Sequence, residues 1–248
     1  MQETTGQGAR VCAAMRFRPQ PIGVLLPSLA LAATLLAGCG SSSSGNGVAS
    51  KTPTQIIAAA KEATAGAVSA HVAGSIVSEG KPIALDMELL ANKGGKGRIT
   101  VEGLTVNLIE VDKAVYINGS TAFYKHLAGS AAATLLQGKW LKAPASSQNF
   151  ASFSALTDLG KLVDSTLAAH GSLARAKDST VGGQKVVGLT DAAKGGTLYV
   201  ASTGAPYPVE LVKTGADGGK IVFDRWNKPV TLAPPANSVN INQLQSGH

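Results

Sequence analysis

The chain has 248 residues, of which 44% are hydrophobic and only 4% aromatic, and its formal net charge is +7. Its lysines and arginines are spread out and do not interleave with aromatic residues, which argues against a nucleic-acid-binding surface. With only Cys12 and Cys39, the chain has no disulfide framework, so it must be held together by the burial of apolar side chains.

The first predicted element is an export signal over residues 1–38. Residues 22–36 carry no charge, and Arg16 and Arg18 supply positive charge just before them. A run of this length suits the hydrophobic region of a signal peptide and is short for a transmembrane helix. We therefore expect the mature protein to be exported.

The export signal ends in Leu36-Ala37-Gly38-Cys39, which has the form of a lipobox. Cleavage between Gly38 and Cys39 would make Cys39 the first mature residue, with acyl chains such as palmitate attached through its thiol. An ordinary secretory signal followed by a chance cysteine is the alternative. Translation from Met15 would also give a normal positively charged start and would leave residues 1–14 untranslated.

A lipidated tether rich in glycine and serine is predicted over residues 39–51, which show no apolar periodicity. As a flexible coil it would have a root-mean-square reach of roughly 20 Å. The folded domain is expected over residues 52–248 and begins with a helix that Thr52 caps and Pro53 opens. About 200 residues suffice for one domain, which we expect to be monomeric.

From His71 onward the apolar pattern changes to period two, which indicates a sheet with one wet face. In residues 83–89 the apolar side chains share one face, and Asp86 and Glu88 take the other, as in an ordinary solvated face. Turn residues separate the strands so closely that antiparallel pairing is expected. The predicted strands cover residues 72–79, 83–89, 96–102, 104–111, 114–118, 184–190, 196–202, 207–214 and 220–226.

Two helical stretches interrupt the strands. Residues 122–136 are rich in alanine, and residues 153–169 place Phe153, Leu156 and Leu159 along one stripe. A large sheet must cover its apolar face, and helices laid across a curved sheet would do so. The predicted fold is therefore α+β, a curved antiparallel half-barrel of about ten strands with two to three helices packed over its concave face.

Catalysis has little support in the sequence, and we expect a protein that is not an enzyme. The four histidines form no metal-binding motif, and no Gly-x-Ser-x-Gly turn presents a serine to a substrate. The Gly-Lys pairs follow no phosphate loop, so we expect no metal, nucleotide or redox cofactor. A hydrolase with a site around His126 or His170 is the third hypothesis.

The composition favours an aliphatic ligand, because aromatic rings on which a sugar or base could stack are few. Burial of each methylene group is worth about 0.8 kcal/mol, so a long acyl chain needs few polar contacts. An ordinary filled core is the alternative interpretation of the same side chains. Strand parity places six residues where they would line a lipid cavity: Leu85, Met87, Leu89, Val106, Leu108 and Leu198.

Several segments after the lipobox and tether resemble a known family. They are Ser69-Ala70-His71-Val72, Val115-Tyr116-Ile117, residues 222–230 and Ala233-Pro234-Pro235. Together they resemble the actinobacterial lipoproteins of the LppX/LprAFG type, distant relatives of the LolA/LolB lipoprotein carriers. The resemblance implies a half-barrel with helices over its open side and an apolar cavity for lipids or lipid-bearing molecules. Trp226 is interpreted as a structural plug at the sheet edge, because Pro229 ends strand pairing just beyond it.

These predictions together describe a membrane-anchored lipoprotein that binds or carries lipids or lipidated molecules at the cell envelope. Cys39 would hold it on the extracytoplasmic face of the cell membrane, and a membrane transporter is one conceivable partner. The alternative is a non-enzymatic interaction module with a filled core that docks on a transporter, a sensor or the cell wall. No nucleic-acid partner is expected.

Overall fold

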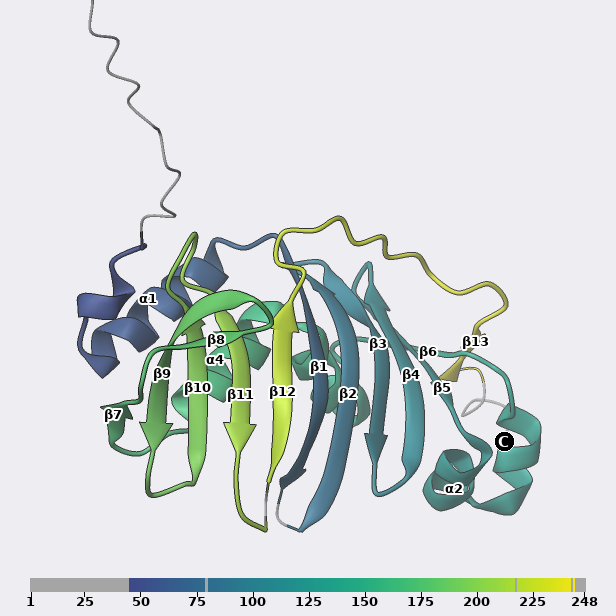
Figure 1. Cartoon of the computed structure of the whole chain (residues 1–248). Coiled ribbons are helices and arrows are strands. Elements are labelled where there is room, and N and C mark those ends of the chain that lie inside the picture. The colour runs from purple at the N-terminus through teal and green to yellow at the C-terminus, as the bar shows by residue number, and fades with distance from the viewer. Residues whose placement is uncertain (1–44, 79, 217, 242, 244–248) are drawn as a thin grey trace, which may run out of the picture. The chain divides into compact units, whose positions relative to one another are not determined.

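In the computed structural model, residues 45–78, 80–216, 218–241 and 243 are described, and their strands form one open, curved sheet (Figure 1). The predicted signal peptide and the predicted lipidation site Cys39 lie outside the described residues. Among the helices that are described, none is long and apolar enough to cross a membrane. The predicted α+β class with a large antiparallel half-barrel is confirmed.

Nine strands of six to ten residues build most of the sheet, and each overlaps a strand that the alternation pattern predicts. They are β1 (Ser69–Ser78), β2 (Lys81–Leu90), β3 (Gly94–Val101), β4 (Leu104–Val111), β5 (Ala114–Gly119), β9 (Gln184–Asp191), β10 (Gly196–Ala201), β11 (Pro208–Lys213) and β12 (Gly219–Asp224). Four shorter strands, which the pattern does not reveal, are β6 (Leu141–Pro144), β7 (Leu173–Arg175), β8 (Ser179–Val181) and β13 (Val239–Asn240).

The strands follow the order β13-β6-β5-β4-β3-β2-β1-β12-β11-β10-β9-β7, and β8 pairs with β9. Every described pairing is antiparallel except that of β6 with β13. The first strand, β1, pairs with β2 on one side and with β12 on the other. Segments from the two ends of the domain therefore meet in the middle of the sheet.

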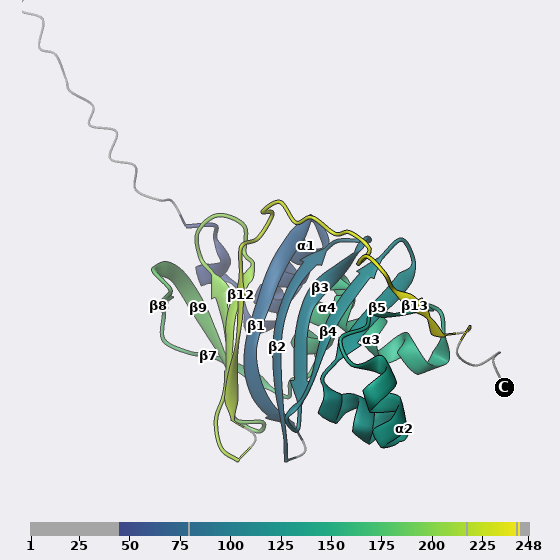
Figure 2. The ribbon, with the colours of Figure 1, turned by 90° about the vertical axis from the view of Figure 1, so that its right-hand side faces the viewer.

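Helices cover the concave face of the sheet (Figures 1 and 2). The α-helices are α1 (Pro53–Ala65), α2 (Thr121–Leu136), α3 (Ala151–Thr157) and α4 (Leu159–Ala168), with short 3-10 helices at Val48–Ser50 and Gln148–Phe150. Helices α1, α3 and α4 pack together, and α3 lies on β3 and β4, whereas α2 lies against β4 and β5. The start of α1 is as predicted: Thr52 and Gln55 form a reciprocal capping box, with Pro53 in the first position.

The single helix predicted over residues 153–169 is wrong, because the chain breaks it at Asp158. This residue adopts an extended backbone conformation and caps α4 with its side chain, which accepts the backbone N–H of Lys161 at 3.0 Å. The apolar stripe continues across the break, with Phe153 packed against the core and Leu159 within it. Apolar periodicity alone therefore could not reveal that an aspartate starts a second helix here.

The predicted boundary between tether and domain lies too late in the chain, because residues 46–50 already pack on the sheet. The backbone N–H of Asn46 donates to the Ser202 carbonyl at 2.9 Å, and its side chain donates to the Ala201 carbonyl at the same distance. Val48 is only 1% exposed. One buried valine between glycines and serines has no periodicity to mark it, so the sequence pattern missed this segment.

The concave face is packed by the side chains of β2 across two glycines of β3. Met87 pairs with Gly97 and Leu89 pairs with Gly95, and both large side chains are at most 1% exposed. A Cβ atom added to Gly95 would lie 2.6 Å from Leu89 Cδ2, and one added to Gly97 would lie 2.7 Å from Met87 Sδ. The side chains of β2 thus occupy the space that the two glycines leave open.

The convex face carries a ladder of charged side chains. His71 lies between two carboxylates, with Nδ1 2.6 Å from Asp224 Oδ1 and Nε2 2.9 Å from Asp86 Oδ1. Glu88 on the neighbouring strand accepts a hydrogen bond from Arg225 at 3.0 Å. Asp86 and Glu88 therefore belong to the wet face of the sheet, as predicted.

We call the end of the sheet at which β2, β4, β10 and β12 end the upper rim, and it lies at the top of Figure 1. Residues 225–238, here named the strap, run along this rim from β12 to β13. At its start the Asn227 N–H donates to the Ser69 carbonyl at 2.9 Å, and at its far end the Val239 N–H donates to the Trp140 carbonyl at 2.7 Å. The strap is thus fixed at both ends.

Trp226 does not lie at the edge of the sheet, where the sequence predicts that it acts as a plug. It follows β12, which lies in the middle of the sheet and not at its edge. Its ring stacks on that of Tyr207 with centroids 4.3 Å apart, and its Nε1 donates to the Pro208 carbonyl at 3.2 Å. Trp226 therefore fixes the start of the strap to the β10–β11 loop.

Candidate functional site

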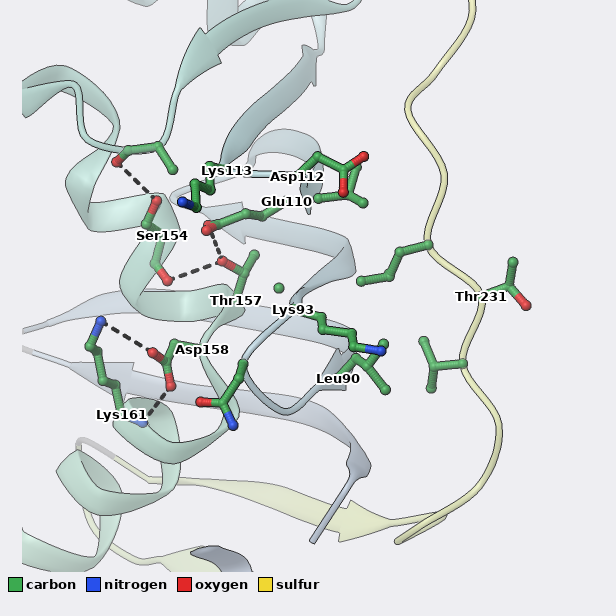
Figure 3. Close-up of a pocket in the computed structure, with 16 residues that line it drawn as sticks. Leu90, Lys93, Glu110, Asp112, Lys113, Ser154, Thr157, Asp158, Lys161 and Thr231 are labelled. Atoms are coloured by element: carbon green, nitrogen blue, oxygen red, sulfur yellow. Dashed lines mark hydrogen bonds and ion pairs between the residues drawn. The ribbon is translucent and has the colours of Figure 1, made fainter.

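A pocket of about 910 Å³ lies at the upper rim beneath the strap (Figure 3). Its walls come from the β2–β3 turn, the β4–β5 turn, the junction of α3 and α4, and the middle of the strap. The residues that line it are Leu90, Asn92, Lys93, Gly94, Glu110, Val111, Asp112, Lys113, Ala145, Ser154, Thr157, Asp158, Lys161, Val230, Thr231 and Leu232.

One wall of the pocket is apolar. Leu90 and Val111 are the last residues of β2 and β4, and the strap adds Val230 and Leu232 to the lining. Leu232 packs against the small cluster that contains Val111. Figure 3 shows the side chain of Thr231 pointing away from the pocket. Because side chains alternate along an extended chain, its neighbours Val230 and Leu232 are the ones that turn inward.

The opposite wall is polar and is held by hydrogen bonds between α3 and the sheet. The hydroxyl of Thr157, a residue with no exposed surface, donates to Glu110 Oε2 at 2.6 Å. The Ser154 hydroxyl donates to the Ala145 carbonyl at 3.3 Å. These bonds fix the end of α3 to β4 and to the chain after β6, so this side of the pocket is rigidly built.

Asp158 places a carboxylate at the start of α4, next to Lys161. Its Oδ2 atom is 3.1 Å from Lys161 Nζ, in addition to the capping bond. Burial of Asp158 raises its pKa, but hydrogen bonds from the backbone and side chain of Lys161, the charge of Lys161 and the Gly160 N–H outweigh this. Together they hold the pKa below its ordinary value of 3.8. Asp158 is therefore ionised at neutral pH and balances the charge of Lys161.

Replacing Asp158 by alanine is expected to lower the free energy of unfolding by about 1 kcal/mol at neutral pH, through the loss of the helix cap. Because the pKa of Asp158 is lowered in the folded state, its contribution is complete above the ordinary value and disappears as the pH falls through the folded-state value. Urea unfolding at neutral pH and at about pH 2 tests this. The difference between wild type and variant should shrink in acid.

The control for this prediction is Asp164→Ala in the same helix. Asp164 is 64% exposed and lies 3.8 Å from Lys61 Nζ, so its removal should change stability by no more than about 0.5 kcal/mol. An equal loss of stability in both variants, or a loss at Asp158 that persists in acid, would show that the cap does not act as described.

Two further lysines face the pocket from the turns of the sheet. Lys93 follows β2, and Lys113 follows Asp112 in the β4–β5 turn. In the part of the chain that the structure describes, neither lysine has a carboxylate within ion-pair distance. The pocket thus combines an aliphatic wall with a charged one, which suits a ligand that has an apolar part and a polar part.

The six residues predicted to line a lipid cavity lie together, but in the packed core and not in this pocket. Leu85 is half-buried against the core, and the other five are at most 7% exposed: Met87, Leu89, Val106, Leu108 and Leu198. None of the six lines the upper-rim pocket. Sequence reasoning missed that pocket because turns and the strap supply its lining, and such segments have no periodicity that would mark a shared face.

The two histidines of the hydrolase hypothesis lie apart from this pocket. His126 is exposed on α2, and Nδ1 of His170 bonds the Gly171 carbonyl at 2.8 Å. Among the described residues, no group of three or more histidine, cysteine, aspartate or glutamate side chains is placed to hold a metal ion.

Comparison with known proteins gives a likeness at the level of structure alone. No family model matches the chain, and no curated protein matches it. The structure is similar to that of LprF from Mycobacterium bovis, with a TM-score of 0.51 and 18% identity over 75% of this chain and 98% of that one. An uncharacterized conserved protein from Thermus thermophilus gives a TM-score of 0.37 and 10% identity over 77% of this chain and 99% of that one. The resemblance to the LppX/LprAFG type that the sequence suggests is therefore confirmed as a likeness of fold, and the described domain has the fold of LprF.

Proposed function

We propose that this protein is a lipoprotein that is anchored through Cys39 and binds a lipid or a lipidated molecule at the upper-rim pocket. The observation that carries the proposal is the place of that pocket, on the rim where the chain joins the sheet at Asn46. Asn46 bonds to the end of β10, which lies on the same rim as the ends of β2 and β4. The fold shared with LprF supports the same function.

The size and lining of the pocket suit an amphiphilic ligand. A volume of about 910 Å³ lies within the range of small-molecule sites in proteins. The aliphatic wall formed by Leu90, Val111, Val230 and Leu232 would take methylene groups, each worth about 0.8 kcal/mol when buried. The charged residues opposite would face the polar part of the ligand.

The anchor would hold this rim close to the membrane surface. With Asn46 bonded to the domain, the predicted tether would act over residues 39–44, for which a coil would have a reach of roughly 13 Å. A diacylglycerol on Cys39 supplies the two chains that stable membrane attachment needs. A ligand could then pass between the bilayer and the pocket without the domain leaving the membrane.

The second candidate function is a non-enzymatic interaction module with a filled core. One observation favours it: the residues expected to line a cavity between sheet and helices, such as Met87, Leu89 and Leu108, are fully packed in the core. Such a module would dock on a transporter, a sensor or the cell wall. It would need no ligand in the upper-rim pocket.

Native mass spectrometry of residues 41–248, which form one compact unit and lack Cys39, distinguishes the two functions. We expect co-purifying acyl species that organic extraction removes. Val230→Glu should reduce their occupancy about tenfold or more, because a carboxylate would replace an aliphatic side chain where methylene groups of the ligand bind.

The matched control is Thr231→Glu, which places the same charge on the neighbouring residue, whose side chain points away from the pocket. It should keep the ligand. If the measured mass is that of the protein without ligand and stays unchanged after incubation with lipid vesicles, the proposal is overturned and the interaction module is favoured. Equal loss in both variants would show that the ligand does not occupy the upper-rim pocket.

A further inference from the structure

Helix α2 lies at the end of the sheet opposite the upper rim (Figure 2). Leu127 is 61% exposed and Leu135 is 68% exposed, and α2 buries only Tyr124 and Ala133 among its described residues. The backbone of Gly129 is not helical, so the two leucines lie on two helical segments of α2, one on each side of this break. Alanines contribute most of the other exposed apolar positions of the helix. An aliphatic surface of this kind on an element at the edge of the domain indicates a contact with another body.

The exposed leucines are not needed to hold α2 in place. Ser120 caps the helix by accepting the Phe123 N–H at 3.1 Å. The hydroxyl of Tyr124, which has no exposed surface, accepts the Gly119 N–H at 2.9 Å and donates to the Lys139 carbonyl at 3.3 Å. These bonds fix the first segment of α2 to the sheet by its buried side, and neither Leu127 nor Leu135 takes part in them. In the second segment, after Gly129, Ala133 is the buried residue.

The charge around α2 has a single sign. The sequence contains no aspartate or glutamate between Asp112 and Asp158, whereas this segment carries four lysines, two of which are Lys125 on α2 and Lys139 just after it. Within the described part of the chain, neither Lys125 nor Lys139 has a carboxylate within ion-pair distance. The acidic residue of the β3–β4 turn at this end, Glu102, pairs with Lys81 at 3.4 Å.

From the exposed leucines of α2 and the lysines beside them, we infer that α2 is a contact site for an anionic lipid surface. Exposed leucines enter the boundary between headgroups and acyl chains, and unpaired lysines beside them attract anionic lipids. A protein partner fits less well, because the centres of protein interfaces are enriched in aromatic residues, methionine and arginine and depleted in lysine and alanine. The inference does not depend on the upper-rim pocket, which lies at the other end of the sheet. Because the proposed tether joins the domain at the upper rim, the lipid surface at α2 would be a different one from the membrane that holds Cys39.

Cosedimentation with vesicles tests the inference, using residues 41–248 so that no acyl anchor contributes. We expect binding to vesicles of phosphatidylcholine mixed with phosphatidylglycerol, weaker binding in high salt, and little binding to phosphatidylcholine alone. Leu127→Asp combined with Leu135→Asp should abolish binding, since both side chains would meet anionic headgroups. Lys125→Ala and Lys139→Ala should each weaken binding about fivefold.

Two controls match these variants elsewhere on the domain. Lys185→Ala combined with Lys194→Ala removes two exposed lysines from β9 and the turn after it, and Val68→Asp alters a valine that is 58% exposed at the upper rim. Both should bind as the wild type does. The inference is overturned if the leucine variant still binds, or if the controls lose as much affinity as the α2 variants. Loss of vesicle binding with the pocket ligand retained would separate this site from the proposed ligand site.

Discussion

Replacing Cys39 by alanine should abolish the retention of processed protein in the membrane. Without the thiol no diacylglycerol can be attached, and the lipobox is then no substrate for cleavage before residue 39. We expect the protein to be found either in the medium or as an uncleaved precursor in the membrane. Membrane fractionation followed by an intact mass measurement separates these products from the lipidated form.

Cys12→Ala provides the control for this experiment, because it removes the other cysteine of the chain from a segment that the export prediction discards. That variant should be processed and retained like the wild type. Mature protein that stays in the membrane fraction despite the loss of Cys39 would refute the lipobox.

Gly97→Ala should be among the most destabilising single substitutions in the domain. The new methyl group would collide with the backbone carbonyl oxygen of Asp86 and lie 2.7 Å from Met87 Sδ, in a core that has no room to shift. Overpacking of this kind costs about 3 kcal/mol. For a domain of this size the midpoint of thermal unfolding should fall by roughly 9 °C, which differential scanning calorimetry would measure.

Gly160→Ala is the matched control, because the same methyl group meets only Asp158 Oδ1 at 3.5 Å there, in the first turn of α4. It should change stability by less than about 1 kcal/mol, in the stabilising direction. If Gly97→Ala unfolded at the wild-type temperature, the concave face at β3 would hold free space. That outcome would support a cavity between the sheet and the helices, which the packed side chains argue against.

Much of the fold could be predicted because the wet and dry faces of the sheet differ so clearly. In β2, apolar residues such as Met87 alternate with Asp86 and Glu88, and in β4 the buried Val106 and Leu108 lie on either side of Asn107. The shorter strands escaped prediction because two to four residues, as in β13, cannot establish a period of two.

The candidate site could not be predicted in the same way. The residues of β2 and β4 whose side chains share the concave face form the core. Their alternation along the strand shows which side chains point to that face, but it does not show whether helices cover them. The pocket depends on where the strap lies, and that follows from the pairing of Val239 with Leu141 and from the stacking of Trp226 on Tyr207. Contacts between segments so far apart in sequence leave no local pattern.

The pairing of β1 with β12 in the middle of the sheet also sets the order in which the domain can form. His71 and Asp224 lie 153 positions apart in the sequence, yet they are bonded across the two central strands. Pairing over such a separation is slow, and until β12 is available one edge of β1 stays open to non-native partners. Here the central strand pair cannot close until almost the whole polypeptide is available, so the topology itself delays completion of the sheet until β12 has been made.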